Sequence, residues 1–122
     1  MATTLVGLAG AGAVWAAEAR PAHAIVKPDW AAKPTGDDMA RYYPAAAAVA
    51  KTGGFATINC QVMHTGRLTG CAVLRESPGA QGFGAAALQL AEIFQMRPKT
   101  LDGQPIDGGE ITIPILFAVP PT

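Results

Sequence analysis

The chain has 122 residues, which is room for a single domain. Nine Lys and Arg residues balance nine Asp and Glu residues, so the formal net charge is zero and no basic field is present to bind a nucleic-acid backbone. The two Cys residues exclude a dense disulfide scaffold and a four-cysteine metal site.

The first 24 residues have the pattern of an export signal. An uncharged apolar run from Thr3 to Ala17, at about 1.5 Å per residue, is too short to cross the hydrocarbon core of a membrane. Small residues around His23 offer a cleavage point, although no Lys or Arg precedes the apolar run. The pattern predicts a signal peptide over residues 1–24. A buried helix rich in Ala and Gly and an uncleaved membrane anchor are the alternatives.

Residues 25–42 are expected to form an extended lead-in to a domain over 43–122. Pro28 and Pro34 hold the residues before them in extended conformations. Trp30 lies between the two prolines and is expected to pack onto the domain.

Two short helices are expected next. Thr35 or Asp37 can cap a helical turn over 38–41. Pro44 suits the first turn of a second helix, which continues through an alanine-rich stretch to Lys51 and ends at a pair of glycines.

A β-hairpin is predicted in the middle of the chain. Two runs rich in strand-forming residues, 55–63 and 68–76, flank a turn signal at residues 64–67. A two-residue loop at Thr65-Gly66 places residue 64 opposite 67. Counting back from the loop gives these opposed pairs: Ile58 with Val73, Cys60 with Cys71, and Val62 with Thr69.

The hairpin register brings the two cysteines together. Directly opposed strand residues have Cα atoms about 4.5–5.5 Å apart, which a disulfide tolerates. We therefore predict a bond between Cys60 and Cys71, and an exported protein would keep it. The alternative is a pair of buried free thiols. A catalytic redox pair is disfavoured because no Cys-x-x-Cys spacing occurs.

A third helix and a last strand complete the predicted fold. The helix is expected over 85–95, after a glycine-rich loop that lacks the nucleotide-binding spacings, and to stop before Pro98. Its apolar stripe consists of Ala87, Leu90, Ala91 and Phe94.

The last strand is expected over Glu110–Val119, where apolar residues occupy every second position. Pro114 lies on the opposite face and removes one ladder donor, which places this strand at a sheet edge. The element order is then α-β-β-α-β. We expect an α+β fold in which a three-stranded antiparallel sheet, in the order 2-1-3, packs against helices.

Several short motifs recur together in one known family. They are Tyr43-Pro44-x-x-Ala47, a hairpin with a glycine turn, Ser77-Pro78, Ala86-Ala87-Leu88, Phe94-x-x-x-Pro98, Gly103-Gln104-Pro105-Ile106 and Ile113-Pro114-Ile115-x-Phe117. This ordered set resembles the C-terminal domain of the TonB family of energy transducers, over roughly Tyr43 to Val119.

The resemblance implies a periplasmic domain that grips an outer-membrane receptor by adding its last strand to an extended receptor segment, with a link to TonB-dependent transport. The binding strand would comprise Glu110, Ile111, Thr112, Ile113, Pro114, Ile115, Leu116 and Phe117. Only about 18 residues separate Ala24 from Tyr43, which reach about 60 Å at full extension. We therefore expect a free-standing domain without a motor, anchored to the membrane only if residues 1–24 are retained.

The competing functions are weaker. The open edge could instead pair with a second copy and form a structural homodimer. The catalytic candidates His64, Glu76, Ser77 and Glu92 form no recognisable acid–base or nucleophile pattern, and Asp37-Asp38 suits helix capping better than metal binding. We expect no enzyme activity, no cofactor or metal, and neither a nucleic acid nor a small molecule as partner.

Overall fold

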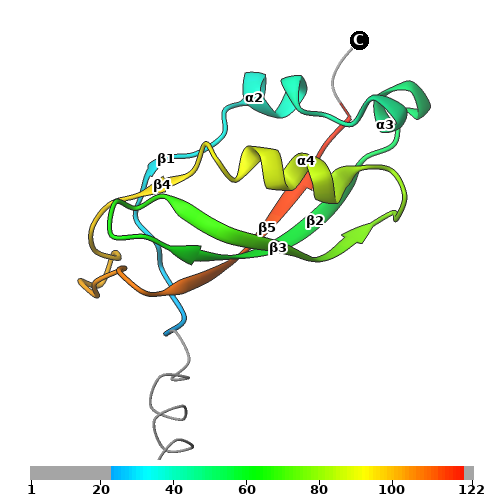
Figure 1. The fold of residues 1–122 in the computed structure, drawn as a ribbon. Coiled ribbons are helices and arrows are strands. Elements are labelled where there is room, and N and C mark those ends of the chain that lie inside the picture. The colour runs from blue at the N-terminus through cyan, green and yellow to red at the C-terminus, as the bar shows by residue number, and fades with distance from the viewer. Residues whose placement is uncertain (1–22, 120–122) are drawn as a thin grey trace, which may run out of the picture.

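The computed structural model of the protein describes residues 23–119 (Figure 1). The predicted signal peptide lies outside these residues except for its last two, and it stays a prediction. In the described range, no helix has the length and apolar character needed to cross a bilayer. The elements, in chain order, are β1 (Trp30–Ala32), α2 (Gly36–Arg41), α3 (Ala45–Ala50), β2 (Gly54–Val62), β3 (Leu68–Ser77), α4 (Phe83–Leu90), β4 (Gln95–Met96) and β5 (Glu110–Phe117).

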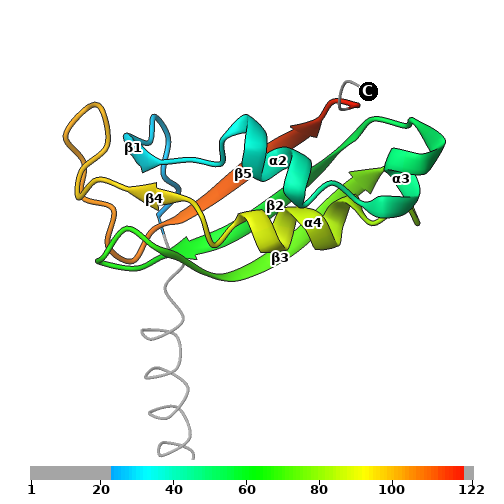
Figure 2. The ribbon, with the colours of Figure 1, turned by 90° about the horizontal axis from the view of Figure 1, so that it is seen from above.

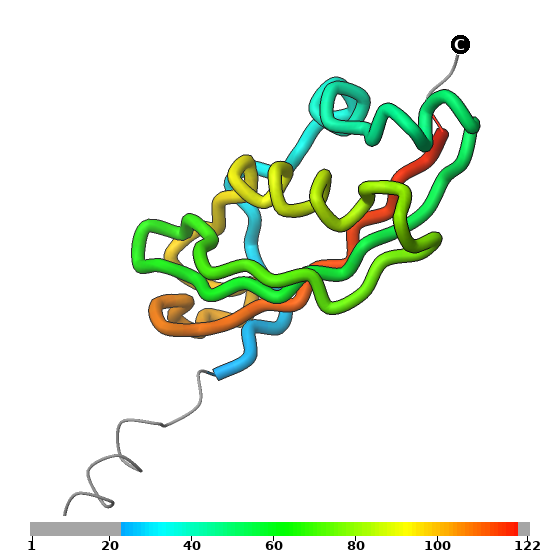
Figure 3. The backbone as a smooth tube through the Cα atoms, turned by 45° about the vertical axis from the view of Figure 1, so that its right-hand side comes forward, coloured from blue at the N-terminus to red at the C-terminus, as the bar shows by residue number. Residues whose placement is uncertain are grey.

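The main sheet has three antiparallel strands in the order β3-β2-β5. This order confirms the predicted arrangement, in which the last strand pairs with the first strand of the hairpin. Within residues 23–119, all three helices lie on one side of the sheet and none lies on the opposite face (Figure 3). The architecture is therefore α+β with two layers.

The core lies between this sheet and the helices. Side chains on β5 alternate between buried and exposed, as its apolar period predicts. At one end of the core the aromatic rings of Tyr43, Phe83 and Phe117 pack together, with ring centroids 5.0–6.0 Å apart. The largest fully buried side chains are Phe83, Phe117, Ile58, Leu90, Ile106 and Cys60.

A second, two-stranded sheet joins β1 to β4 and was not predicted. The prediction of a helix over 85–95 is wrong at both ends, because α4 spans Phe83–Leu90. The chain leaves the helix through turns that bond Ile93 to Leu90 and Phe94 to Ala91, and then pairs with β1. Helical propensity is a weak preference, and here tertiary pairing overrides it. The predicted apolar stripe is nevertheless buried.

The hairpin register also needs correction. The Met63 N–H donates to the Arg67 carbonyl, so the loop has three residues rather than two, and Val62 pairs with Leu68 instead of Thr69. Further along, the register shifts between Asn59/Ala72 and Gln61/Thr69. At this bulge two residues of β3, Gly70 and Cys71, lie opposite Cys60, and Gly70 has a positive φ. The bulge cancels the error at the turn and restores the predicted pair of Ile58 with Val73.

The tip of the hairpin is tied to β4 through Gly66. Its carbonyl accepts a hydrogen bond of 2.9 Å from the Met96 N–H, and its φ of +89° favours glycine. A Cβ at this position would overlap the Met96 carbonyl oxygen. The turn and the small sheet therefore fit together only with glycine at position 66.

We expect Gly66→Ala to lower the free energy of unfolding by about 2 kcal/mol, from backbone strain and overlap together. Gly103→Ala is the matched control, because Gly103 has a φ of +85° but open space around its Cα. Urea unfolding of both variants separates the two causes. Equal losses in the two variants would show that the contact with β4 contributes nothing.

Candidate functional site

The outer edge of β5 is the candidate site. On its inner side β5 pairs with β2 without a register shift, from Gly54 opposite Phe117 to Gln61 opposite Glu110. On its outer side no strand of residues 23–119 pairs with 112–117. The strand is two residues shorter than the predicted Glu110–Val119, and the Val119 side chain is 41% exposed. The prediction that β5 lies at a sheet edge is confirmed.

The hydrogen bonds of Glu110 show which backbone groups face outward. Its N–H donates to the His23 carbonyl and its carbonyl accepts from the Ile25 N–H, so both groups point away from β2. Backbone groups of successive residues in a strand point to opposite sides. The N–H and C=O groups of Thr112 and Leu116 therefore face outward as well.

Pro114 belongs to this outward set. We predicted that it removes a hydrogen-bond donor from the sheet. The missing N–H would have pointed to the open edge, so the pairing of β5 with β2 loses no hydrogen bond. The open edge thus presents carbonyl groups at positions 112, 114 and 116 but N–H groups only at Thr112 and Leu116. Such an edge can accept three hydrogen bonds and donate two.

β3, at the other edge of the sheet, is much less regular. Its pairing with β2 is interrupted by two register shifts, one beside Leu74 and one beside Gly70. Bulges bend an edge strand and increase its twist, which discourages the pairing of a further strand. A covalent bond to β2 further fixes this side of the sheet, through the predicted disulfide between Cys60 and Cys71. Its two Cα atoms are 4.0 Å apart.

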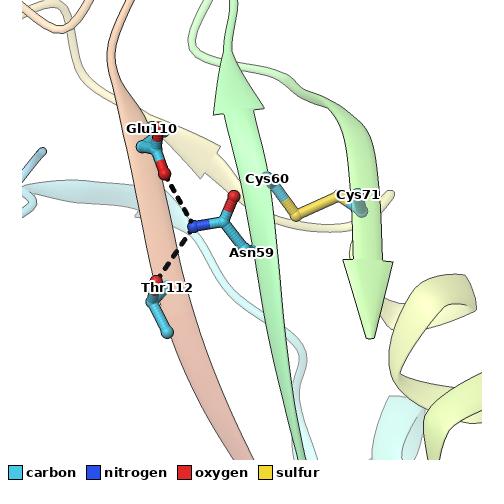
Figure 4. The surroundings of a disulfide bond; sticks show 5 residues. All are labelled: Asn59, Cys60, Cys71, Glu110 and Thr112. Carbon is cyan, nitrogen blue, oxygen red and sulfur yellow. Dashed lines mark hydrogen bonds between the residues drawn. A yellow bond between two sulfur atoms is a disulfide. The ribbon is translucent and has the colours of Figure 1, made fainter. Parts of the chain in front are cut away.

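Side chains on the face without helices hold β5 to β2. The Asn59 amide on β2 donates to the Glu110 carboxylate at 3.1 Å and to the Thr112 hydroxyl at 3.0 Å (Figure 4). Both acceptors come from β5, two residues apart on the same face. This side-chain bridge supports the register of β5 without using any of its outward backbone groups.

A groove runs beside the open edge, on the side of the sheet that carries the helices. It has a volume of about 350 Å³, and β5 forms one of its sides through residues 113–116. The opposite side consists of Trp30 from β1, Lys33 and Pro34 from the link between β1 and α2, Met39 from α2, and Phe94 from the segment after α4. Figure 2 shows β1 and α2 along this side of the molecule. The expected packing of Trp30 is confirmed, because its ring lies 4.9 Å from that of Phe94.

The wall that α2 contributes is held by its capping box. Thr35, one of the two predicted caps, accepts the Asp38 N–H through its hydroxyl oxygen. The Thr35 backbone N–H, and then its hydroxyl, donate to the Asp38 carboxylate and lower the pKa of that carboxyl below its usual value. Asp38 therefore serves as a capping residue.

The four catalytic candidates are not gathered at one place. Glu76 and Ser77 are neighbours at the end of β3, whereas His64 is exposed at the hairpin tip before the start of that strand, and Glu92 is exposed in the turn after α4. The Glu76 carboxylate accepts the Gly84 N–H at 3.0 Å, so it caps the first turn of α4. Within residues 23–119 no three His, Cys, Asp or Glu side chains are grouped as metal ligands.

The groove itself could not be found from the sequence. Its two sides come from residues near 30–39 and near 113–116, and no periodic pattern relates segments so far apart. The only available signal was Trp30, a large aromatic residue in a proline-rich segment.

Comparisons with known proteins agree with this geometry. The family described as the Gram-negative bacterial TonB protein C-terminal matches residues 39–119. An uncharacterized protein of Caulobacter vibrioides is 38% identical over 64 residues, which span 52% of this chain and 64% of that protein. The solution structure of the Pseudomonas aeruginosa TonB C-terminal domain is similar, with a TM-score of 0.52 and 20% identity, over 66% of this chain and 79% of that one. By its family match and its fold, this chain belongs to the TonB C-terminal family.

Proposed function

We propose that this domain binds an extended segment of another envelope protein by adding that segment to β5 as a further strand. The observation that supports this most directly is the row of outward backbone groups at Thr112, Pro114 and Leu116, which have no partner strand within residues 23–119. Main-chain hydrogen bonds of this kind supply affinity, and alternate side chains supply specificity. The proposed binding strand is β5, Glu110–Phe117, the segment that the family resemblance implies.

The partner class follows from the family. An outer-membrane receptor of TonB-dependent transport is the partner that we propose, with another envelope protein as the broader class. Of the two edge strands, β5 is the better candidate for pairing with a partner segment, because β5 is regular and β3 is bulged. Binding rather than catalysis is also favoured by the positions of the catalytic candidates, because Glu76 caps α4 and His64 lies at the opposite end of β3 from Glu76 and Ser77.

We place this activity in the periplasm. Residues 1–24 would direct export, residues 25–42 would lead into the domain, and residues 43–122 would form the TonB-like domain. The disulfide between Cys60 and Cys71 supports this location, because such bonds persist in oxidising compartments.

Self-association through β5 is the alternative function. Antiparallel pairing of two β5 strands about Pro114 would bring two residues without N–H groups opposite one another, so two hydrogen bonds would be lost. A partner of different sequence can place donors there. Sedimentation over a range of concentrations tests the alternative, because a dimer that forms through β5 would require concentration-dependent association.

Strand addition predicts a specific change in amide hydrogen exchange. The Ile113 and Ile115 amides already bond to β2, whereas those of Thr112 and Leu116 face outward. Titration with synthetic periplasmic peptides of outer-membrane receptors is expected to slow exchange at Thr112 and Leu116. Thr112→Pro, which removes one outward donor, is expected to weaken binding roughly three- to ten-fold, as one net hydrogen bond is worth about 0.5–1.5 kcal/mol.

Thr112→Val is the matched control for this experiment. It removes the hydroxyl that Asn59 contacts, as Thr112→Pro does, but keeps the backbone N–H. The valine variant should bind like the unchanged protein. Saturable binding that leaves exchange at Thr112 and Leu116 unaltered would contradict strand addition at β5.

A further inference from the structure

We infer that the domain contains a binding site for a new N-terminus at Ile25, which a peptidase creates by hydrolysing the bond between Ala24 and Ile25. Water adds across this bond and leaves a carboxylate on Ala24 and an ammonium group on Ile25. The N-terminal site consists of Gly109, Glu110 and a small hollow beside them. This inference rests on the proposed export of the chain and does not require strand addition at β5.

Ile25 is the residue at which the described chain enters the core. His23 and Ala24 are exposed, whereas the Ile25 side chain is only 7% exposed and belongs to the core cluster. Gly109 gives it room, because an added Cβ there would lie 2.6 Å from the Ile25 Cδ1 atom. The sequence predicts cleavage after Ala24. The predicted cleavage point therefore coincides with the boundary between exposed and buried residues.

The main-chain contact of Ile25 with β5 does not depend on the residues before it. The Ile25 N–H donates to the Glu110 carbonyl at 2.8 Å, and the same nitrogen becomes the ammonium group after hydrolysis. A hydrogen bond from a charged donor is stronger than one from an amide. Cleavage thus keeps the bond between Ile25 and Glu110 and supplies it with a stronger donor.

A hollow of about 230 Å³ offers the ammonium group further acceptors. It is lined by residues 23–26 and by Thr100, Gln104 and Pro105. The Pro105 carbonyl lies 3.3 Å from the His23 Nε2 atom, so removal of His23 frees it, and Gln104 adds a side-chain amide. None of the described lining residues that remain after cleavage has a charged side chain. A positive charge there would meet oxygen acceptors and no neighbouring cation.

Cleavage also changes the hydrogen bonding of β5. In the uncleaved chain the Glu110 N–H donates to the His23 carbonyl at 2.9 Å. Removal of residues 1–24 takes this acceptor away, and the outward Glu110 N–H becomes free. The open edge then has a third donor in addition to those of Thr112 and Leu116. Hydrolysis would thus couple export of the chain to exposure of its edge.

The first experiment determines where the exported protein begins. The full chain is produced in a Gram-negative host, and the N-terminus of the periplasmic product is determined by mass spectrometry. We expect it to be Ile25. Ala24→Leu should prevent hydrolysis of this bond, because the residue before it must be small. Ala31→Leu changes another exposed alanine and should leave processing normal. A periplasmic chain that begins at any other residue would overturn the inference.

The second experiment measures whether the new amine is bound. Acetylation of the Ile25 α-amine by an N-hydroxysuccinimide ester is expected to be about ten-fold slower in the folded protein than in urea, because its hydrogen bonds must break first. Lys27 is exposed two residues away, so its ε-amine is the internal control. Gly109→Ala should displace Ile25 and restore fast acetylation, whereas Gly79→Ala, with open space around it, should not. Ile25→Ala removes the buried side chain but keeps the amine, and it tests the same point if Gly109→Ala fails to fold.

Amide exchange at Glu110 tests the effect on β5. Exchange should be roughly three- to ten-fold faster in the processed protein than in the full-length Ala24→Leu chain, since one hydrogen bond is lost. Exchange at Ile113, which bonds to β2 in both proteins, should be the same.

The outcomes separate this inference from the proposed function. An Ile25 amine that reacts as fast in the folded as in the unfolded protein, or equal exchange at Glu110 in the two proteins, would overturn the inference and leave export and strand addition standing. A chain that stays in the cytoplasm with residues 1–24 intact would overturn the proposed location as well.

Discussion

Replacing Phe83 with alanine is expected to lower the free energy of unfolding by about 3–5 kcal/mol. The side chain is fully buried, and its ring lies 5.0 Å from that of Phe117 and 5.8 Å from that of Tyr43. These contacts join the first turn of α4 to the end of β5 and to the chain before α3. Truncation would leave a cavity that three separate elements border, so simple collapse is difficult. Urea unfolding followed by circular dichroism measures the loss.

Leu88→Ala is the control for this prediction. Leu88 lies on the same helix but is 37% exposed, so its truncation removes less buried surface and is expected to lower stability by about 1 kcal/mol or less. A loss at Phe83 no greater than that at Leu88 would show that the aromatic cluster does not hold the helix to the sheet.

Phe83 also illustrates what sequence patterns could not reveal. It lies in a segment rich in glycine that was interpreted as a loop, yet it begins α4 and is one of the most buried residues. Two glycines beside it, at positions 82 and 84, lower the local helical propensity. Burial of the ring between Tyr43 and Phe117 outweighs that preference, and such burial is visible only in three dimensions.

β5 shows the opposite case. Ile111, Ile113, Ile115 and Phe117 recur at every second position, and this period alone was enough to predict a strand with one buried face. Pro114 added the correct expectation of an edge position. The side to which the Pro114 backbone faces could be assigned only from the hydrogen bonds of Glu110. The sequence does not show on which side of β5 its partner strand lies.

The hairpin lies between these two cases. The predicted hairpin loop was one residue too short. A one-residue slip in the pairing register would normally move every side chain of β3 to the other face of the sheet. The bulge at Gly70 inserts one residue and corrects the slip before Cys71. The cysteines therefore pair as predicted although the turn that was used to predict them differs. The groove wall has no comparable local signal, since β1 and β4 are separated by more than half of the domain.

Loss of the disulfide is expected to lower the free energy of unfolding by about 3 kcal/mol, because the bond restricts an 11-residue separation in the unfolded chain. Cys60 is fully buried in the central strand, and Cys71 lies in the bulge of β3. Reduction frees β3 from the only covalent link that holds its bulged segment to β2 within residues 23–119. Urea unfolding with and without dithiothreitol measures the effect on the unchanged protein.

The double variant Cys60→Ala/Cys71→Ala supplies the control, since its stability should match that of the reduced protein and should not respond to dithiothreitol. Peptide binding is expected to survive reduction at temperatures where the protein stays folded, because β5 bonds to the opposite side of β2 from the disulfide. A folded but reduced protein that no longer binds would show that the two edges of the sheet are coupled. An unchanged unfolding midpoint after complete reduction would show that the bulged strand is held by its hydrogen bonds and side-chain packing alone, and that the bond contributes nothing to stability.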